Sequence, residues 1–229
     1  RYPYRRSLIS KFEKFIKEEI NTSEIVTRPD EITALGEKYS TLVAGSDQLW
    51  NPAITNGLDT NYLLGFSTTK RKIAFSSSFG SYKHTPEELE ILRRELKHFH
   101  AISVREPEAR SKLESLVPKK EVHVTLDPTL LLDMEEWSKV STDPGRTGRP
   151  YILVYALGSN AFLKKTVETA RNFLQMDVIA INQDPFLNFK TNKHVKDAGP
   201  SEFLGYFLNA SFIITNSCLL YTSYSSDDS

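Results

Sequence analysis

Residues 41–52 read Thr-Leu-Val-Ala-Gly-Ser-Asp-Gln-Leu-Trp-Asn-Pro, a short apolar run followed by a polar turn and a large aromatic residue. The run 41–44 predicts a buried strand, and Gly45 permits backbone geometry that a Cβ atom would block. Ser46, Asp47 and Gln48 then offer a hydroxyl, a carboxylate and an amide within one turn. Because ligand sites in open α/β sheets lie beyond the carboxyl ends of strands, this turn is the first candidate site.

Strand and helix patterns alternate along the rest of the chain. A strong helix start is Thr85-Pro86-Glu87-Glu88, which combines a Thr N-cap, a Pro at the first helical position and a Glu at the third. The alternation predicts an α/β protein with parallel sheets and right-handed crossovers. Further strands are expected at 72–76, 101–104, 122–125, 151–157, 178–181 and 212–214.

Residues 141–150 contain two Gly and two Pro residues and no apolar anchor, so they are expected to form a linker. The linker divides the chain into two partial Rossmann-like domains, residues 1–140 and 151–217, with a cleft between them. Residues 218–229 are expected to be a non-native or disordered tail, because Cys218 to Ser223 read like a translated sequencing adapter. A genuine polar C-terminus is the alternative, and both ends suggest a fragment.

Composition excludes several classes of protein. The chain of 229 residues has 29 Lys+Arg and 29 Asp+Glu, and this zero net charge argues against a nucleic-acid binder driven by bulk charge. No apolar stretch approaches the roughly 20 residues that span a bilayer, so no integral membrane segment is expected. The single cysteine, Cys218, lies in the predicted tail, which argues against disulfides and thiolate chemistry. We expect a cytoplasmic protein with no metal site and no cofactor.

Arg105 is the candidate anion-binding residue. It follows the predicted strand 101–104 and precedes Pro107 at a helix start. A guanidinium at this position can bind a carboxylate or phosphate through two parallel hydrogen bonds. The alternative is a surface arginine paired with Glu106 or Glu108.

Other strand ends carry further candidates. Asp47 and Gln48 can orient a sugar hydroxyl, or Asp47 can act as a general base, although an Asp in a turn often caps its own backbone. Ser46 is a further candidate for binding substrate. Ser78 lies in the segment 76–80, which can form either a backbone-amide nest for an anion or a plain strand exit.

Two more strand ends are open to either a site role or a structural one. Asp127 precedes Pro128, so its carboxylate either faces the cleft or shapes a turn. Asn216 and Ser217 follow the last strand and are expected at the edge of the site, binding substrate.

Taken together, five segments in order resemble the polysaccharide pyruvyl transferase family. They span nearly all of residues 10–217 and are Gly45 to Pro52, Ala74 to Gly80, Ser103 to Glu106, Leu126 to Leu131, and Gly199 to Phe203 continuing to Thr215-Asn216-Ser217.

The resemblance implies a two-domain fold of the glycosyltransferase-B type, with the second domain incomplete here. It implies a transferase of exopolysaccharide biosynthesis that moves a pyruvyl group from phosphoenolpyruvate onto sugar hydroxyls of a cell-surface polysaccharide precursor, forming a ketal. Arg105 would bind phosphoenolpyruvate. The acceptor would be a glycan or a lipid-linked sugar, and a lipid-linked one would place the enzyme at the inner face of the membrane.

The resemblance also implies a site histidine directly after Thr-Asn-Ser, where this chain has Cys218-Leu219-Leu220. The 229-residue chain itself is therefore expected to be inactive. Two other functions stay open: a nucleotide-sugar glycosyltransferase on the same architecture, and a non-catalytic glycan-binding relative.

Overall fold

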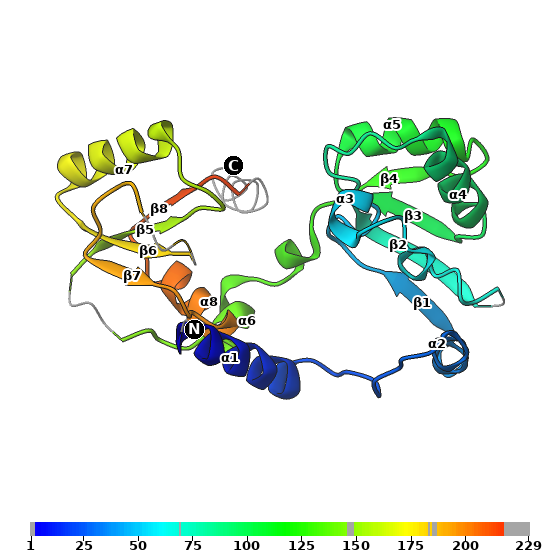
Figure 1. Cartoon of the computed structure of the whole chain (residues 1–229), viewed down its shortest axis with the longest axis horizontal. Coiled ribbons are helices and arrows are strands. Elements are labelled where there is room, and N and C mark those ends of the chain that lie inside the picture. Colours follow the sequence, from blue (N-terminus) through cyan, green and yellow to red (C-terminus); the bar gives the residue numbers. More distant parts are fainter. Residues whose placement is uncertain (1–2, 69, 146–148, 183, 185–186, 218–229) are drawn as a thin grey trace. The chain divides into compact units, whose positions relative to one another are not determined.

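The structure, a computed structural model, describes residues 3–68, 70–145, 149–182, 184 and 187–217. The chain divides into two compact units (Figure 1). The central unit is residues 24–131, and the terminal unit combines residues 1–23 with residues 132–229. The predicted tail, 218–229, and residues 146–148 of the predicted linker lie outside the described residues.

The central unit is built on a four-stranded sheet in which every pairing is parallel. Its strands lie side by side in chain order: β1 (Thr41–Ala44), β2 (Arg71–Ser77), β3 (Ala101–Val104) and β4 (Val122–Val124). The helical segments are α2 (Pro29–Gly36), α3 (Pro52–Thr55), η1 (Thr60–Leu63), α4 (Pro86–Leu96), α5 (Pro107–Leu116) and η2 (Pro128–Leu131).

The predicted start of α4 is confirmed in detail. The Thr85 hydroxyl accepts a hydrogen bond from the Glu88 backbone N–H at 3.3 Å, and the Glu88 carboxylate accepts one from the Thr85 N–H at 2.8 Å. This reciprocal pair satisfies two backbone donors that a helix end otherwise leaves free.

Trp50 anchors the turn after β1 to the core of the central unit. Its side chain is fully buried, with ring centroids 5.5 Å from Phe79 and 6.4 Å from Phe99. Its indole N–H donates to the backbone carbonyl of Tyr62 at 3.1 Å, so the one polar atom of the buried ring is satisfied. The polar turn between β1 and Trp50 is thereby held at the sheet edge.

The terminal unit contains a second four-stranded sheet, again wholly parallel. Its strands lie in the order β7-β6-β5-β8, which within this unit is the order 3-2-1-4 of doubly wound nucleotide-binding sheets. They are β5 (Tyr151–Tyr155), β6 (Asp177–Ile181), β7 (Lys193–Val195) and β8 (Phe212–Thr215), and the helices are α1 (Pro3–Glu19), α6 (Met134–Lys139), α7 (Ala161–Leu174) and α8 (Pro200–Leu208).

Helices cover both faces of this second sheet (Figure 1). Successive side chains of a strand point to opposite faces, and β5 shows the consequence. Ile152 and Val154 pack with the cluster under α7, whereas Tyr151 and Leu153 pack with the cluster under α8. Burial on both faces explains why β5 reads as a continuous apolar run.

Helix α1 belongs to the terminal unit, which differs from the predicted domain boundaries. The Ser7 hydroxyl donates to the Asp197 carboxylate at 2.6 Å. The Lys11 ammonium lies 2.8 Å from the Glu202 carboxylate and donates to the Asp197 carbonyl at 2.9 Å. A domain boundary drawn at residue 140 separates these partners, because their pairing leaves no local signal in the sequence.

The α/β class with parallel sheets is confirmed. Within the described residues, no helix is both long and apolar enough to cross a membrane.

Gly205 on α8 lets the helix pack directly against the segment that precedes β5. A Cβ atom at this position would lie 1.9 Å from the Thr142 carbonyl oxygen, while the Thr142 N–H donates to the Ser201 carbonyl at 2.9 Å. We expect Gly205→Ala to lower the free energy of unfolding by about 1–3 kcal/mol, because the helix must move away from backbone atoms. Urea denaturation measures this loss.

Gly158→Ala is the control in the same unit. An added Cβ there meets no atom within 4 Å, so the change should stay within about 0.5 kcal/mol. Equal stabilities of the two variants would contradict the packing that we describe for α8.

Candidate functional site

The carboxyl ends of all four central strands carry polar side chains that contact one another. Ser46 follows β1, Ser76 and Ser77 end β2, Arg105 follows β3, and Asp127 follows β4. In a parallel sheet these ends lie at one edge, which is where ligands bind in open α/β folds.

Asp127 ties the ends of the strands together. Its Oδ2 atom accepts hydrogen bonds from the Ser46 hydroxyl and from Arg105 Nη1, the latter at 2.9 Å. Its Oδ1 atom accepts from the Thr129 N–H at 3.0 Å and from the Thr129 hydroxyl at 2.8 Å. A carboxylate with only 7% of its side chain exposed is therefore compensated by four donors.

The charge of Asp127 is stabilised despite its burial. Burial raises the pKa of Asp127, but the hydrogen bonds from Ser46, Thr129 and Arg105 together outweigh it, so the pKa lies below its ordinary value. For Arg105, burial lowers the pKa, and the hydrogen bonds to Asp127 and Glu106 shift it upward overall. The pair is an ion pair at neutral pH.

Arg105 is oriented by carboxylates on two sides. Its Nε atom donates to Glu106 Oε1 at 3.3 Å, and its Nη1 atom donates to Asp127. The pairing of Arg105 with Glu106, one of the two alternatives for this arginine, is thus present. A guanidinium has five N–H groups, and three of these donate to no acceptor among the described residues. The side chain is 20% exposed, so these donors remain accessible to an anion.

Glu106 links Arg105 to the end of β2. Its Oε1 atom also accepts a hydrogen bond from the Ser78 hydroxyl at 2.6 Å, and that hydroxyl accepts one from the Gly80 N–H at 2.9 Å. The other carboxylate oxygen, Oε2, is buried and has no hydrogen-bond partner in the part of the chain that the structure describes. Unsatisfied buried oxygens are rare and costly, and strain or a catalytic role is among their explanations.

The backbone is strained at two residues of this edge. Asp47 has φ +82° and Ser76 has φ +53°, the left-handed region that non-glycine residues seldom adopt. At Ser76 the pairing of β2 with β3 shifts register between Ala74 and Ser77, which marks a bulge. The bulge lets the Ser76 hydroxyl donate to the Leu126 carbonyl at 2.6 Å.

Asp47 and Gln48 have local structural roles. Asp47 Oδ1 accepts a hydrogen bond from the Gln48 N–H at 2.8 Å. This is the capping of its own turn that was the structural alternative for Asp47. Gln48 Oε1 accepts a hydrogen bond from Asn51 Nδ2 at 2.7 Å. A Cβ atom added to Gly80 would lie 2.1 Å from this same Oε1 atom. Gln48 therefore packs against the loop after β2, and Gly80, with φ +56°, is required there.

The segment 76–80 does not form an open amide nest. Three of its N–H groups already donate within the protein: Ser76 to the Ser103 hydroxyl, Ser78 to the Asp47 carbonyl, and Gly80 to the Ser78 hydroxyl. The plain strand exit, which was the alternative, describes this segment.

Asn216 and Ser217 belong to the terminal unit, whereas Arg105 and Asp127 belong to the central unit. Asn216 Oδ1 accepts from the Leu157 N–H at 2.8 Å, and its Nδ2 donates to the Gly158 carbonyl at 3.2 Å. Asn216 thus joins the loops after β5 and β8, and its amide is occupied by backbone. The Ser217 N–H donates to the Thr215 hydroxyl at 3.0 Å.

Sequence reasoning missed a half-buried histidine–lysine pair beside this edge. His84 Nε2 lies 2.8 Å from the Trp50 carbonyl and so donates to it, which leaves Nδ1 to accept from Lys112 Nζ at 2.7 Å. Burial lowers the pKa of both side chains. Neither residue stands in a recognisable motif. Among the described residues, no cluster of His, Cys, Asp and Glu has a geometry that could hold a metal ion.

The Asp127 network predicts a pH-dependent stability. A carboxylate whose pKa is depressed by folding stabilises the protein above its unfolded pKa, near 3.8, and this stabilisation is lost as the pH falls through the folded pKa. We expect Asp127→Asn to cost about 2–4 kcal/mol at pH 7, because Arg105 loses its buried partner. The difference from wild type should shrink as the pH falls below about 4, in denaturation experiments.

Asp30→Asn is the matched control, since Asp30 pairs with Arg28 at the surface with 71% of its side chain exposed. It should cost less than about 1 kcal/mol. A pH-independent loss in Asp127→Asn would show that the carboxylate is not held charged in the fold.

Comparison with known proteins gives one match. No curated protein sequence and no solved structure matches the chain. The model of the family described as polysaccharide pyruvyl transferase matches residues 1–217 of the 229. This match covers the described residues of both units, including every polar residue of the central sheet edge. The chain therefore belongs to the polysaccharide pyruvyl transferase family.

Proposed function

We propose that the protein transfers the pyruvyl group of phosphoenolpyruvate onto two hydroxyls of a sugar in a polysaccharide precursor, and that Arg105 binds the donor. Family membership supports a transferase acting on polysaccharide. The observation that carries the donor assignment is the oriented guanidinium of Arg105. Three of its N–H groups donate to no acceptor in the described part of the chain, and they suit the phosphate or carboxylate of phosphoenolpyruvate.

The reaction makes two demands on the site. One sugar hydroxyl bonds to C2 of phosphoenolpyruvate while C3 gains a proton, and the second hydroxyl then displaces phosphate from C2, giving a cyclic ketal and inorganic phosphate. A cation must hold the negative donor, and an acid–base group must take the hydroxyl protons and deliver one of them to C3. Arg105 meets the first demand. Asp47 is our candidate for the second, because its Oδ2 accepts no hydrogen bond from the described residues.

The negative neighbours of Arg105 position it for this role. Asp127 and Glu106 hold the Nε and Nη1 groups of the guanidinium. The remaining N–H groups of Arg105 therefore have a fixed direction before phosphoenolpyruvate binds. The adjacent start of α5 at Pro107 adds partial positive charge next to Arg105. We further propose a glycosyltransferase-B arrangement of the two units, a cytoplasmic enzyme, and a lipid-linked or free glycan acceptor.

Phosphate release by the gene product that contains this chain tests the reaction. It should require both phosphoenolpyruvate and the glycan acceptor, and ¹³C NMR of the product should show a ketal carbon derived from C2. The strand order of the terminal sheet favours a rival, a nucleotide-sugar glycosyltransferase. A nucleotide that raises the melting temperature, with no effect of phosphoenolpyruvate, would establish that rival instead.

Removing the guanidinium should weaken donor binding. In calorimetric titration of the 229-residue chain with phosphoenolpyruvate, we expect Arg105→Ala to raise Kd roughly 10- to 100-fold, the value of one or two charge-assisted hydrogen bonds. Arg105→Lys should lie between wild type and Arg105→Ala, because lysine keeps the charge but not the planar fork.

Arg110→Ala is the matched control, because Arg110 lies on α5, the helix that follows Arg105. Arg110 pairs with Glu114 at 2.8 Å and is half exposed, away from Asp127. If Arg110→Ala and Arg105→Ala weaken binding equally, or if neither does, Arg105 is not the donor-binding residue.

A further inference from the structure

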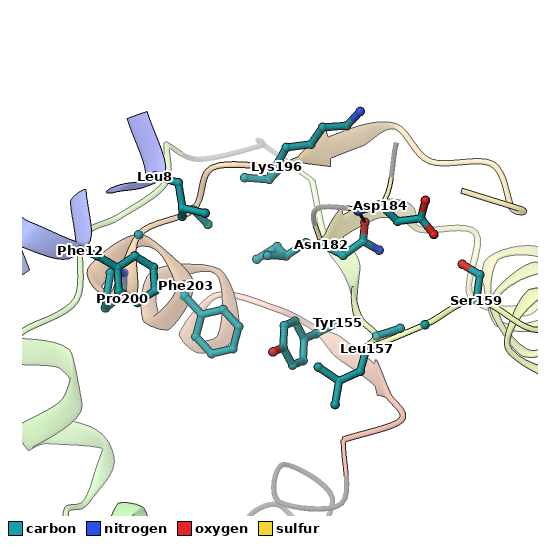
Figure 2. Close-up of a pocket in the computed structure, with 16 residues that line it drawn as sticks. Leu8, Phe12, Tyr155, Leu157, Ser159, Asn182, Asp184, Lys196, Pro200 and Phe203 are labelled. Atoms are coloured by element: carbon teal, nitrogen blue, oxygen red, sulfur yellow. Dashed lines mark hydrogen bonds between the residues drawn. The ribbon is translucent and has the colours of Figure 1, made fainter. Parts of the chain in front are cut away.

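The terminal unit contains a separate pocket of about 560 Å³ at the carboxyl ends of β5, β6 and β7 (Figure 2). This volume lies within the range of small-ligand sites. None of the residues that line it belongs to the Arg105 network. Its walls come from distant parts of the chain, since Leu8 and Phe12 on α1 face residues of β5, β6 and α8.

One side of the pocket is apolar and aromatic. Tyr155 at the end of β5 and Phe203 on α8 meet at right angles, with ring centroids 5.1 Å apart. Phe12 extends this wall from α1, with 46% of its surface exposed. Aromatic rings that are at least partly exposed offer a surface for the apolar face of a ring-shaped ligand.

The other side is polar, and Asn182 is its best-defined group. Asn182 Oδ1 lies 3.1 Å from the Asp184 backbone N–H, which can only donate, so this atom is the amide oxygen. His194 Nε2, 3.0 Å from the same oxygen, must therefore also donate. Burial lowers the pKa of His194, and the charge of Lys196 lowers it further, so the ring is neutral at pH 7.

The Asn182 oxygen already accepts two hydrogen bonds, so the Nδ2 group is the part of the amide that can bind a ligand. This amide nitrogen donates to no acceptor among the described residues. In Figure 2, the Ser159 hydroxyl and the Asp184 carboxylate lie at the same end of the pocket as the Asn182 amide, whereas Phe203 and Tyr155 lie toward the other. Donor and acceptor groups thus converge at one end and rings at the other.

The geometry points to a site for a sugar ring in this pocket, with neighbouring hydroxyls bound by Asn182, Asp184 and Ser159 and an apolar ring face on Tyr155, Phe203 and Phe12. A pair of adjacent hydroxyls both donates and accepts, which matches an amide N–H beside a carboxylate and a hydroxyl. If the bound sugar is the acceptor of the pyruvyl group, the inference rests on the proposed function. The ribose of a nucleotide presents the same pair of hydroxyls.

Saturation-transfer NMR on the 229-residue chain tests the site with two sets of probes. The first set is the methyl glycosides of glucose, galactose and mannose. The second is uridine 5′-monophosphate with its 2′-deoxy analogue. Binding of a hexoside identifies the acceptor as the source of the sugar. Binding of uridine monophosphate, lost in the deoxy analogue, identifies a nucleotide ribose. Binding of neither set overturns the inference.

Two variants locate the site. Asn182→Asp keeps the acceptors for His194 and Asp184 but removes the Nδ2 donor, and Phe12→Ala removes one exposed ring. We expect each to weaken the binding of whichever probe binds by about 2- to 10-fold, with an unchanged melting temperature. The controls are Asn172→Asp on the exposed surface of α7 and Ile9→Ala, 57% exposed on α1, and neither should change binding.

If Asn182→Asp and Phe12→Ala bind the probe as wild type does, the sugar lies elsewhere and the inference is wrong. This failure is distinct from that of the proposed function. If the protein binds hexosides through Asn182 but releases no phosphate from phosphoenolpyruvate, the sugar site is supported and the proposed pyruvyl transfer is wrong.

Discussion

The central sheet edge depends on one buried carboxylate, that of Asp127. β1 and β4 are the outer strands of the central sheet and share no backbone hydrogen bonds, yet Ser46 from the end of β1 donates to Asp127 at the end of β4. Arg105, which follows β3, donates to the same oxygen. The burial of this charge is costly unless all of its donors are in place, so the carboxylate makes the geometry of three loops interdependent. The strained conformations of Asp47 and Ser76 lie on two of the segments that meet there.

This constraint explains why a rigid structural network also suits ligand binding. An arginine held by carboxylates on one edge loses little conformational freedom when an anion binds its other edge. The terminal sheet also carries an oriented polar side chain at the carboxyl ends of its strands, although the groups differ. There His194 and the Asp184 backbone occupy the oxygen of Asn182, and its nitrogen is left for a ligand. Each parallel sheet therefore presents, at its carboxyl edge, a polar side chain that the protein orients but does not saturate.

Much of this could be predicted from short-range patterns. The α/β alternation, the capping box of α4 and the position of Arg105 at a strand end follow from local sequence, because caps and strand ends are determined by adjacent residues. Long-range pairing could not be predicted. Ser7 and Asp197 are 190 residues apart, and only their contact assigns α1 to the terminal unit. The role of Asp127 also depends on distant donors, since an Asp before a Pro reads equally well as a turn. Asn182 carries no motif, and only the neighbours of its oxygen show that its nitrogen has no acceptor among the described residues.

The central claim is that the guanidinium of Arg105, oriented by Asp127 and Glu106, receives the donor substrate. A crystal structure of the chain with phosphoenolpyruvate tests this most directly. The account predicts a phosphate or carboxylate oxygen within about 2.7–2.9 Å of an Arg105 nitrogen, with the Asp127 contact kept. Phosphoenolpyruvate ordered elsewhere on the protein, with Arg105 still contacting only Asp127 and Glu106, would contradict it.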